Sequence, residues 1–575
     1  MVAVEQEVFT KYLIVGAGPA GLQMAYFLQR NGREYIVLEK EHAAGAFFAT
    51  QPVHRKLLSI NKKYNYFTEE EFNWRHDWNS LLSDDSEMRF TKYSDELFPH
   101  ADDIYQYLQD FAAHFALNVR YNCAVKHITR NQDQEFVVTT EHGDHYRCKV
   151  LLMGLGTTQP LVPEEIEGIE FATGYENQEL DLELYKNKRV GILGGGNSAF
   201  ETADYLSGVA CYVHILANSP VKMAWDTHYA GHVRAINNNI FDMYQLKSMH
   251  AVLNPRLKKI EKLPDGVLQI SHEYDYPEAN PPGTLKLTRE YDYIIRCTGW
   301  KYVAPSMFQD EIAPVICEKG KYPAMTSSWE SVSTPDVYFI GAAMAGNDRQ
   351  AASSFIHGFR YNIRTLSSLL EEKYEEAPYP CTNPGPFDLD PFLDWMYTRF
   401  STSAALFQLF GHLCDAVVVS DDLESAVRYE ELPVQYAREN LVTEDSHVLI
   451  FTLEFGFKKF GESSITFFGP SDPTNPSCAA FLHPVIRYYR GGEMQEFHFA
   501  DSLLARWDRP HSSGGAVMSN HHAFLQWLNA RLSANFDIEE PTEAGAYHKW
   551  SEKEKEMWER THMTTTTTPD CVRPI

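Results

Sequence analysis

The sequence predicts an α/β fold in which two units of strand, glycine turn and helix are nested, followed by a smaller α+β domain. Two segments predict the repeated unit: residues 13–28 read LIVGAGPAGLQMAYFL and residues 191–206 read GILGGGNSAFETADYL. In each, an apolar strand runs into closely spaced glycines and then a segment of helical period. A third observation is the proline-rich run APYPCTNPGPFDLDP at 377–391, which indicates a linker to the last domain.

The first unit has the complete pattern of a Rossmann-like dinucleotide-binding crossover. Gly16 permits the tight turn, Gly18 lets the backbone approach a pyrophosphate, and Gly21 lets the helix pack closely on the strand, with the phosphates at the amino end of the helix. A second strand, YIVLE, ends on Glu39, where a carboxylate can accept hydrogen bonds from both ribose hydroxyls. Because strand, helix, second strand and acid all agree, we expect this unit to bind FAD.

The second unit differs at its most informative position. Gly194 and Gly196 fill the first two glycine positions and Ala199 the third, which is a permitted replacement. The residue that corresponds to Glu39 is Ala217, and the polar or cationic residues Asn218, Ser219 and Lys222 follow it. A 2′-phosphate suits such groups, so the pattern favours NADPH over NADH. An NADH site that uses other contacts is the alternative.

Further strand-and-turn segments divide the chain into domains. The segment 148–163 ends its strand near Gly156, and 291–300 ends its strand at Thr298 and Gly299. These segments resemble those of flavoproteins with two dinucleotide domains, which implies that such strands mark the exit from the FAD domain and the return to it, and that a last strand, Gly341 and a helix complete that domain. The predicted FAD domain is therefore 8–158 and 288–375, with 159–287 inserted as the NAD(P)H domain.

The carboxyl-terminal domain is expected at 376–545. SAALFQLFGHLCDAVV reads as a helix, SHVLIFTLEF, SSITFFG and HPVIRYYRG alternate like strands, and NHHAFLQWLNARLS reads as a closing helix. Residues 546–575, which include TTTTT, have the composition of a disordered tail. The sequence shows no other internal repeat.

The order of these motifs resembles the flavoproteins with two dinucleotide domains, especially the NADPH-dependent flavin monooxygenases. A closer resemblance is to the FAD-dependent oxidoreductase-domain family of the endoplasmic reticulum, over about residues 10–500. It rests on GAGPAGLQMAYFLQR, HRKLLSINKKY, RHDWNSLLSD, GNSAFETA, THYAGHVRAINN, YQLKS, SFIHGFRYNIR and FLHPVIRYYR. Luminal members of that family carry a signal peptide and a retention tail that this sequence lacks, so we expect a cytoplasmic relative.

Pattern and resemblance together give the residues expected at the two cofactors. They are Gly16, Gly18, Pro19, Ala20, Gly21, Glu39, Lys40, Arg55, Trp78, Asn79, Gly156, Gly194, Gly196, Asn197, Ser198, Ala199, Glu201, Ser219, Lys222, Thr298, Gly299, Gly341 and Phe355.

Composition excludes several classes of partner and site. The 575 residues carry a net charge of −27, which argues against a nucleic-acid or anionic-membrane partner, and no segment is apolar enough to span a membrane. The nine cysteines include no Cys-x-x-Cys pair, so a local redox dithiol and an evident zinc site are not expected. His483, His521 and His522 also lack metal-ligand spacing. The oligomeric state is left open.

Without a dithiol, the electrons are expected to go to dioxygen or directly to a small organic substrate. The resemblance implies a monooxygenase that acts through a flavin hydroperoxide, with Asn61 at the reactive edge of the flavin, although Asn61 equally suits a turn before two lysines. The alternatives are a halogenase that uses Lys258 or Lys259, and a reductase or redox-linked binding protein without oxygen insertion. His228, Tyr229, Arg234, Asn237 and Trp300 are weaker candidates for the cleft, because surface or core roles explain them as well.

Overall fold

The computed structural model describes most of the chain, which divides into two compact units. The described residues are 8–157, 159–243, 248–277, 281–317, 320–456, 476–479, 481–507, 521–532 and 536. The first unit comprises Met1–Tyr66 and His76–Pro378, and the second comprises Phe67–Arg75 and Tyr379–Ile575. The expected strand within 463–469 and the expected tail at 546–575 lie outside the described residues.

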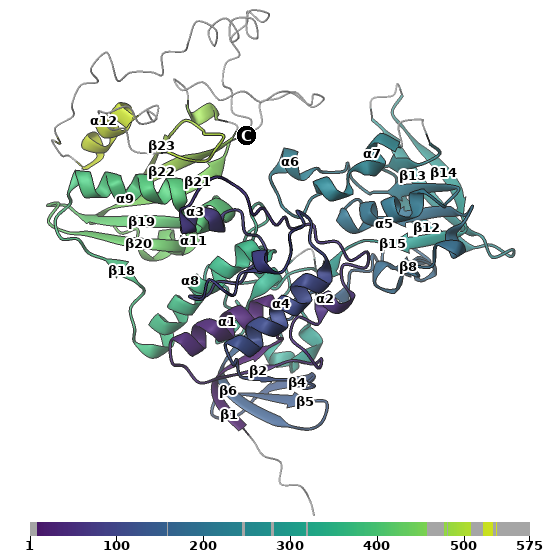
Figure 1. Ribbon diagram of the computed structural model, residues 1–575, viewed down its shortest axis with the longest axis horizontal. Coiled ribbons are helices and arrows are strands. Elements are labelled where there is room, and N and C mark those ends of the chain that lie inside the picture. The colour runs from purple at the N-terminus through teal and green to yellow at the C-terminus, as the bar shows by residue number, and fades with distance from the viewer. Residues whose placement is uncertain are drawn as a thin grey trace, which may run out of the picture. The chain divides into compact units, whose positions relative to one another are not determined.

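The first sheet of the first unit is built on the amino-terminal crossover (Figure 1). Its strand order is β3-β2-β1-β6-β5-β4, and β17 also pairs with β6. The strands are β1 (Val8–Val15), β2 (Tyr35–Leu38), β3 (Val119–Arg120), β4 (Val125–Arg130), β5 (Phe136–Thr140), β6 (His145–Met153) and β17 (Val337–Phe339). β1 pairs in parallel with both β2 and β6, and β2 is buried throughout. Continuous apolar strands of this kind are typical of a parallel sheet covered by helices.

Helices from distant parts of the sequence pack beside this sheet. They are α1 (Pro19–Arg30), α2 (Phe47–Thr50), α4 (Ala101–His114) and α8 (Ile356–Glu375). α1 contacts β2, α4 and α8, and α8 also contacts the 3₁₀ turn Gly341–Gly346 that follows β17. The last strand, glycine and helix therefore return to the first crossover, as expected.

The second sheet is inserted between β6 and β17. Its parallel strand order is β11-β10-β9-β15-β8, and an antiparallel sheet β12-β13-β14 accompanies it. The elements are β8 (Thr173–Gly174), β9 (Arg189–Leu193), α5 (Asn197–Ser207), β10 (Tyr212–Leu216), α6 (Ala224–Thr227), α7 (Asn239–Met243), β11 (Ala251–Leu253), β12 (Arg256–Lys262), β13 (Leu268–Tyr276), β14 (Gly283–Tyr291) and β15 (Tyr293–Arg296). β7 (Gln159–Pro160) pairs with β16 (Trp300–Lys301) in the two linking segments.

One predicted boundary is wrong. The sequence placed the return to the FAD domain at residue 288, but β15 pairs with β9 over four residues and belongs to the second sheet. An apolar strand followed by Thr-Gly closes either type of sheet, so the local pattern did not distinguish them.

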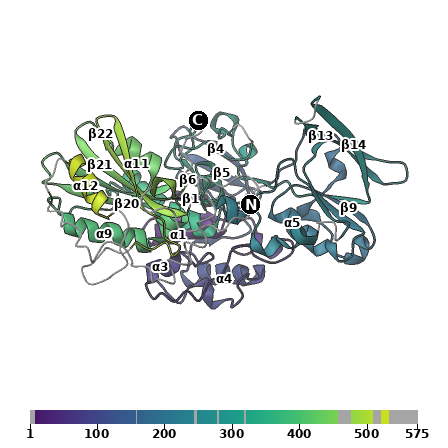
Figure 2. The same ribbon diagram turned by 90° about the horizontal axis from the view of Figure 1, so that it is seen from above.

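The second unit is an α+β domain. Its antiparallel sheet has the order β18-β20-β19-β21-β22-β23, and Figure 2 shows α9 and α12 near this sheet. The strands are β18 (Cys381–Thr382), β19 (Leu413–Ser420), β20 (Ala426–Pro433), β21 (Ser446–Phe455), β22 (Leu482–Arg490) and β23 (Glu493–His498). The helices are α3 (Glu70–Trp74), α9 (Leu389–Thr402), α10 (Ala404–Gln408), α11 (Val434–Asn440) and α12 (His521–Leu532). Apolar residues of α9 and α12 share one core with the strands.

The segment Phe67–Arg75 corrects a second expectation, because it belongs to this unit although it lies within the predicted 8–158 domain. Arg75 is fully buried and donates to the carbonyl oxygens of Phe400 (2.8 Å), Ser403 (3.1 Å) and Ala505 (2.7 Å). A buried guanidinium requires such acceptors, and contacts with residues far away in the sequence supply them. No described helix is both long and apolar enough to cross a membrane.

Candidate functional site

The first glycine turn brings three backbone segments together. The Gly16 amide donates to the Leu38 carbonyl over 2.8 Å, and Gly16 has a φ of +103°. A Cβ on Gly16 would lie 2.5 Å from the Gly154 oxygen, and a Cβ on Gly21 would lie 1.9 Å from the Gly16 oxygen. The turn, α1 and the end of β6 therefore approach one another more closely than any side chain permits.

The middle of the same turn is open. A Cβ on Gly18 or on Gly156 would meet no atom within 4 Å, and Gly18 is the residue before the first turn of α1, which begins at Pro19. Free backbone N–H groups at a helix amino end attract phosphate oxygens. The cradle therefore fits the pyrophosphate of FAD. Ala20 faces inward, because a Cβ on Gly341 would lie 2.6 Å from the Ala20 Cβ.

Glu39 is 7% exposed and is held in place by backbone N–H groups. One carboxylate oxygen accepts from the Ala17 amide at 2.7 Å and the other from the Glu41 amide at 2.9 Å. Each oxygen keeps acceptor capacity for a ribose hydroxyl. Two cations expected at the cofactor, Lys40 and Arg55, instead pair with carboxylates of the protein. The Lys40 amine is exposed and lies 3.6 Å from the Glu41 carboxylate, and Arg55 forms an ion pair with Asp102.

The second glycine turn repeats the first. Gly194 has a φ of +123°, and a Cβ there would lie 2.2 Å from the Cys297 oxygen. A Cβ on Gly196 would meet nothing within 4 Å, so this cradle is also open at the amino end of α5, whose first residues include Ser198 and the buried Ala199. At the position that corresponds to Glu39, the buried Ala217 packs against Gly195.

The loop after β10 supplies the groups expected at a 2′-phosphate. Ser219 and Lys222 are both exposed, and Lys222 forms no ion pair with the described residues. A cation without a carboxylate neighbour is available to an external anion. The geometry is thus compatible with the expected NADPH site.

Asn197 is expected at a cofactor, but the structure shows it hydrogen-bonded within the protein. Its amide nitrogen donates to the carbonyls of Gly231 (3.2 Å) and His232 (2.8 Å), and its oxygen accepts from the Arg234 amide and the Asn237 side chain, both at 3.0 Å. These four hydrogen bonds fix the segment after α6 against α5. Asn197 is therefore a positioning residue for Arg234.

Arg234 reaches an aromatic group at the amino end of α8. Its guanidinium carbon lies 4.7 Å from the centre of the Trp78 ring, and the His357 ring stacks on Trp78 at 4.3 Å. Phe355, the residue before α8, stacks on His357 at 5.7 Å. Burial lowers the pKa of Arg234, and burial together with Arg360 and Arg234 holds the pKa of His357 well below its usual range. His357 is therefore neutral.

Several buried polar atoms of the first unit have no hydrogen-bond partner among the described residues. Three of them are Asn79 Oδ1, next to Trp78 in the chain, His357 Nδ1, and Thr157 Oγ1 beside the open Gly156, and Asn79 and His357 are 0% and 1% exposed. Such atoms cost about 1–3 kcal/mol each when left unsatisfied. They are suitable acceptors or donors for a bound cofactor, which agrees with the FAD expected here. Asn61 is 4% exposed and donates to the Ser94 carbonyl at 2.7 Å.

Glu201 does not face an open cradle. Its carboxylate accepts a hydrogen bond from the Tyr175 hydroxyl, which itself accepts from the Val53 amide at 2.8 Å. Burial raises the pKa of Glu201 to about 7, and burial lowers the pKa of the nearby His54, which lies 3.3 Å from Thr202 of α5, to about 4. This cluster ties α5 to the segment before Arg55.

Thr298 and Gly299 also serve the connection between the sheets. The Thr298 hydroxyl and the Arg296 guanidinium donate to the Leu161 carbonyl, and the Leu161 amide donates to the Gly299 carbonyl at 2.8 Å. Of the weaker candidates, Trp300 lies in β16, and Asn237 is bound to Asn197.

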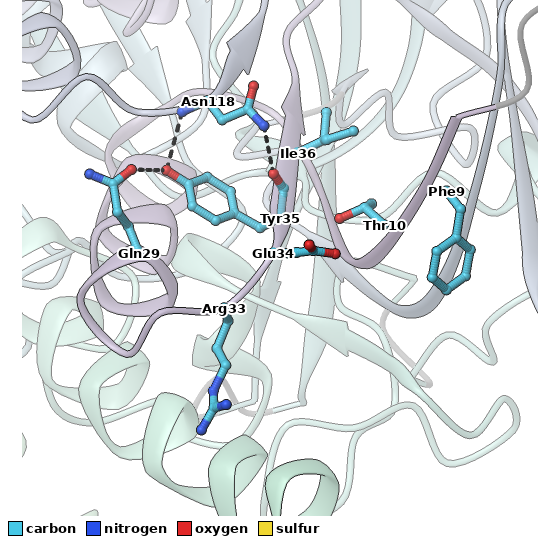
Figure 3. Close-up of a pocket in the computed structure, with 8 residues that line it drawn as sticks. All are labelled: Phe9, Thr10, Gln29, Arg33, Glu34, Tyr35, Ile36 and Asn118. Atoms are coloured by element: carbon cyan, nitrogen blue, oxygen red, sulfur yellow. Dashed lines mark hydrogen bonds between the residues drawn. The ribbon is translucent and has the colours of Figure 1, made fainter.

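A hollow of about 410 Å³ lies elsewhere in this unit. Figure 3 shows Gln29 and Asn118 hydrogen-bonded to Tyr35 beside it. Phe9 and Thr10 line it at the start of β1, whereas the glycine turn follows the end of β1. It is therefore not the cofactor site.

Some candidate residues have no local sequence signal. His357 is the clearest, since a buried histidine at the start of a helix gives no local pattern. Lys321, Tyr322 and Arg349 lie in irregular loops, so no periodic pattern points to them either.

The comparison with known proteins gives the family. Residues 13–341 match the family model described as pyridine nucleotide-disulphide oxidoreductase. The chain is 36% identical over 509 residues to FAD-dependent oxidoreductase domain-containing protein 2 of Mus musculus, covering 83% of this chain and 76% of that protein. The chain belongs to this FAD-dependent oxidoreductase family. The resemblance drawn from the motifs and the α/β fold with two dinucleotide-binding domains are thereby confirmed.

Two shorter matches have names that describe different electron acceptors. A thioredoxin reductase of Ureaplasma parvum is 29% identical over 215 residues, 37% of this chain and 57% of that protein. A probable indole-3-pyruvate monooxygenase of Arabidopsis thaliana, YUCCA7, is 26% identical over 205 residues, 33% of this chain and 43% of that protein.

The two glycines of the first turn have separable roles. We expect Gly18→Val to fold but to lose FAD, because its extended backbone accepts a side chain that would then occupy the phosphate cradle. Gly21→Val should instead destabilise the protein, because its Cβ meets the Gly16 oxygen. Flavin absorbance per chain and thermal unfolding measure the two effects. Normal flavin content in folded Gly18→Val would contradict the assignment of the cradle.

The raised pKa of Glu201 makes folding depend on pH. Between the ordinary carboxyl pKa and about 7, the folded state binds more protons than the unfolded state, so stability falls as pH rises through this window. Glu201→Gln should therefore match the parent at pH 5 and be more stable at pH 8, by on the order of 2–3 kcal/mol. Thermal unfolding at both pH values measures this, with the exposed Glu183→Gln as control. An equal effect at both pH values would contradict it.

Proposed function

We propose that the chain is an NADPH-dependent FAD monooxygenase that uses dioxygen to oxidise a small organic molecule. The observation that carries this proposal is a set of buried polar side chains in the first unit: His357 at the start of α8, Asn79 next to its stacking partner Trp78, and Asn61, each at most 4% exposed. Oxygen insertion requires that water be kept from the reacting centre. The similarity to a protein named as a probable monooxygenase supports the same reaction class.

The residues expected to hold FAD are those of the first turn together with Glu39 and Gly156, and those expected to hold NADPH are Gly194, Gly196, Ser219 and Lys222. When bound there, FAD would supply the hydride-accepting chemistry that links NADPH to dioxygen. Each glycine turn follows the carboxyl end of a parallel strand, so both nucleotides would be held at the carboxyl edges of the sheets.

The buried side chains near the start of α8 would orient the reacting groups and exclude water. They would not exchange protons. His357 is neutral and stacked, so it offers a fixed nitrogen without a charge. Asn61 is proposed as the amide at the reacting edge. Its bond to Ser94 fixes its orientation, and an amide donates and accepts without changing its protonation.

The other electron acceptors have less support. A dithiol reductase needs two neighbouring cysteines, and the seven cysteines whose side chains the structure describes are all free thiols without a Cys-x-x-Cys pair. A halogenase would need a lysine amine with a free electron pair. Lys259 instead lies 2.8 Å from both Glu167 and Glu261, and these carboxylates raise its pKa, while Lys258 lies 3.5 Å from Glu273.

Lys222 should decide the choice of nucleotide. Lys222→Ala should raise KM for NADPH roughly tenfold and leave KM for NADH unchanged, since a charged hydrogen bond to a phosphate contributes about 1.5–3 kcal/mol. Initial rates of nucleotide oxidation measure both constants. Lys188→Ala removes the same charge from another exposed position and is the control. Equal changes in the two constants would remove the 2′-phosphate assignment.

Asn61 should control the loss of electrons to oxygen. Asn61→Asp would place a carboxylate against the Ser94 carbonyl, so Asn61→Ser is the cleaner variant. We expect it to bind FAD and to be reduced by NADPH under nitrogen at the parental rate. In air without substrate, it should release peroxide roughly ten- to a hundredfold faster than the parent, because the reacting edge has lost its amide.

Two results would contradict this function. Peroxide release by the parent as fast as by Asn61→Ser would indicate an oxidase with an open site. Full turnover of NADPH by the parent under nitrogen with an added organic acceptor would indicate a reductase.

A further inference from the structure

Two cations and two tyrosines of the first unit form a cluster outside the cofactor cradles. The Lys321 Nζ lies 5.4 Å from the ring centre of Tyr302 and 5.6 Å from that of Tyr322, and the guanidinium carbon of Arg349 lies 4.0 Å from the ring centre of Tyr322. The two tyrosine rings stack at 4.8 Å with an angle of 19°. We call Tyr302, Lys321, Tyr322 and Arg349 the cation–tyrosine cluster.

Neither cation has a carboxylate neighbour within the described part of the chain. The structure contains many ion pairs, and the sequence has 78 acidic residues against 51 lysines and arginines, yet none of the described acids lies within 4.0 Å of Lys321 or Arg349. Burial lowers the pKa of Lys321, and the charge of Arg349 lowers it further. Two like charges, one of them desolvated, are unfavourable together unless an anion accompanies them.

The cluster is next to the residues expected at the cofactors. A Cβ on Gly299 would lie 3.8 Å from the Lys321 Nζ. Tyr302 follows β16, and Arg349 lies in the loop between the 3₁₀ turn after β17 and α8. In the same loop, Ser354 is 3.2 Å from the hydroxyl of Tyr229, which lies between α6 and the Arg234 segment. An anion held here would therefore lie beside the elements of both dinucleotide domains.

The types of side chain define the ligand. A planar guanidinium binds a carboxylate through two parallel hydrogen bonds, and an ammonium group adds a point charge. The two tyrosine rings stack on each other, and Tyr322 is only 3% exposed, so they back the two cations with apolar surface. We propose that the cation–tyrosine cluster binds the carboxylate of the organic substrate, which is therefore a small organic acid. This inference rests on the proposed function, because it assigns the substrate class of that reaction.

Calorimetric titration of the oxidised, FAD-loaded protein tests this assignment, with phenylacetate and its uncharged analogue phenylacetamide as probes. We expect the parent to bind phenylacetate at least tenfold more tightly than phenylacetamide. Lys321→Gln and Arg349→Gln should each reduce this preference to about twofold or less. Lys188→Gln, the matched loss of an exposed charge, should leave it unchanged.

Two further arms identify the source of the anion. Titration with NADP⁺ distinguishes a nucleotide phosphate from a carboxylate: if Lys321→Gln weakens NADP⁺ binding and leaves the phenylacetate preference intact, the proposal is overturned. Glu318 lies outside the described residues but is close in sequence, so Glu318→Gln is also titrated. A tenfold gain or a loss of the preference in that variant would show an internal ion pair and would likewise overturn the proposal.

The parent titration is decisive by itself. Equal affinity for the acid and the amide, or no binding of phenylacetate, overturns the assignment of the cluster. Because the titration involves neither NADPH turnover nor oxygen, its result is separate from the test with Asn61→Ser. If the test with Asn61→Ser failed, the reaction assigned to the chain would change, but the result of the binding titration would remain valid.

Discussion

The structure of the first unit depends on two glycines that have no room for a side chain. Gly16 meets the carbonyl of Gly154, and Gly194 meets the carbonyl of Cys297, with hypothetical Cβ distances of 2.5 and 2.2 Å. In both cases the contact joins the end of one parallel strand to the end of its neighbour, β1 to β6 and β9 to β15. A Cβ at either position would separate strands that pair in parallel.

This constraint also places the functional groups. Since the glycine turn follows a strand and precedes a helix, the closest backbone approach occurs at the carboxyl edge of each sheet, where ligands bind in such folds. The segments after β6 and β15 then lead directly to Gly156 and to Thr298 and Gly299. The close contacts at Gly16 and Gly194 therefore hold neighbouring strands together in both sheets, and they also bring the linking segments to the glycine turns.

The local patterns were sufficient for these parts of the molecule. In each unit, the informative residues lie within about thirty residues of one another. In the first unit they are Gly16, Gly21 and Glu39, and the structure gives these residues a close turn and a carboxylate held by backbone amides. In the second unit, Ala217 stands where the first has Glu39. The third position differs between the copies for a physical reason. A Cβ on Gly21 would clash with Gly16, whereas the buried Ala199 shows that the second turn accommodates one more carbon.

The sequence was uninformative where contacts join distant segments. The boundary at 288 and the place of 67–75 were wrong because strand pairing with β9 and the three acceptors of Arg75 are properties of the fold. The stack of Trp78 and His357 joins residues 279 positions apart. The local pattern does not decide the role of Asn197, because an amide beside a glycine turn suits either a phosphate or a neighbouring loop.

The buried amides show how the chain distributes its hydrogen bonds. Asn197 uses both its nitrogen and its oxygen within the protein, and Asn61 uses its nitrogen on Ser94. Asn79, which is fully buried, donates only weakly to Ser59 and Ile60 at 3.4 and 3.3 Å, and its oxygen has no partner among the described residues. A protein core rarely leaves such an atom unsatisfied, because the desolvation cost is not recovered. This oxygen and the unpaired nitrogen of His357 are therefore available to a bound group.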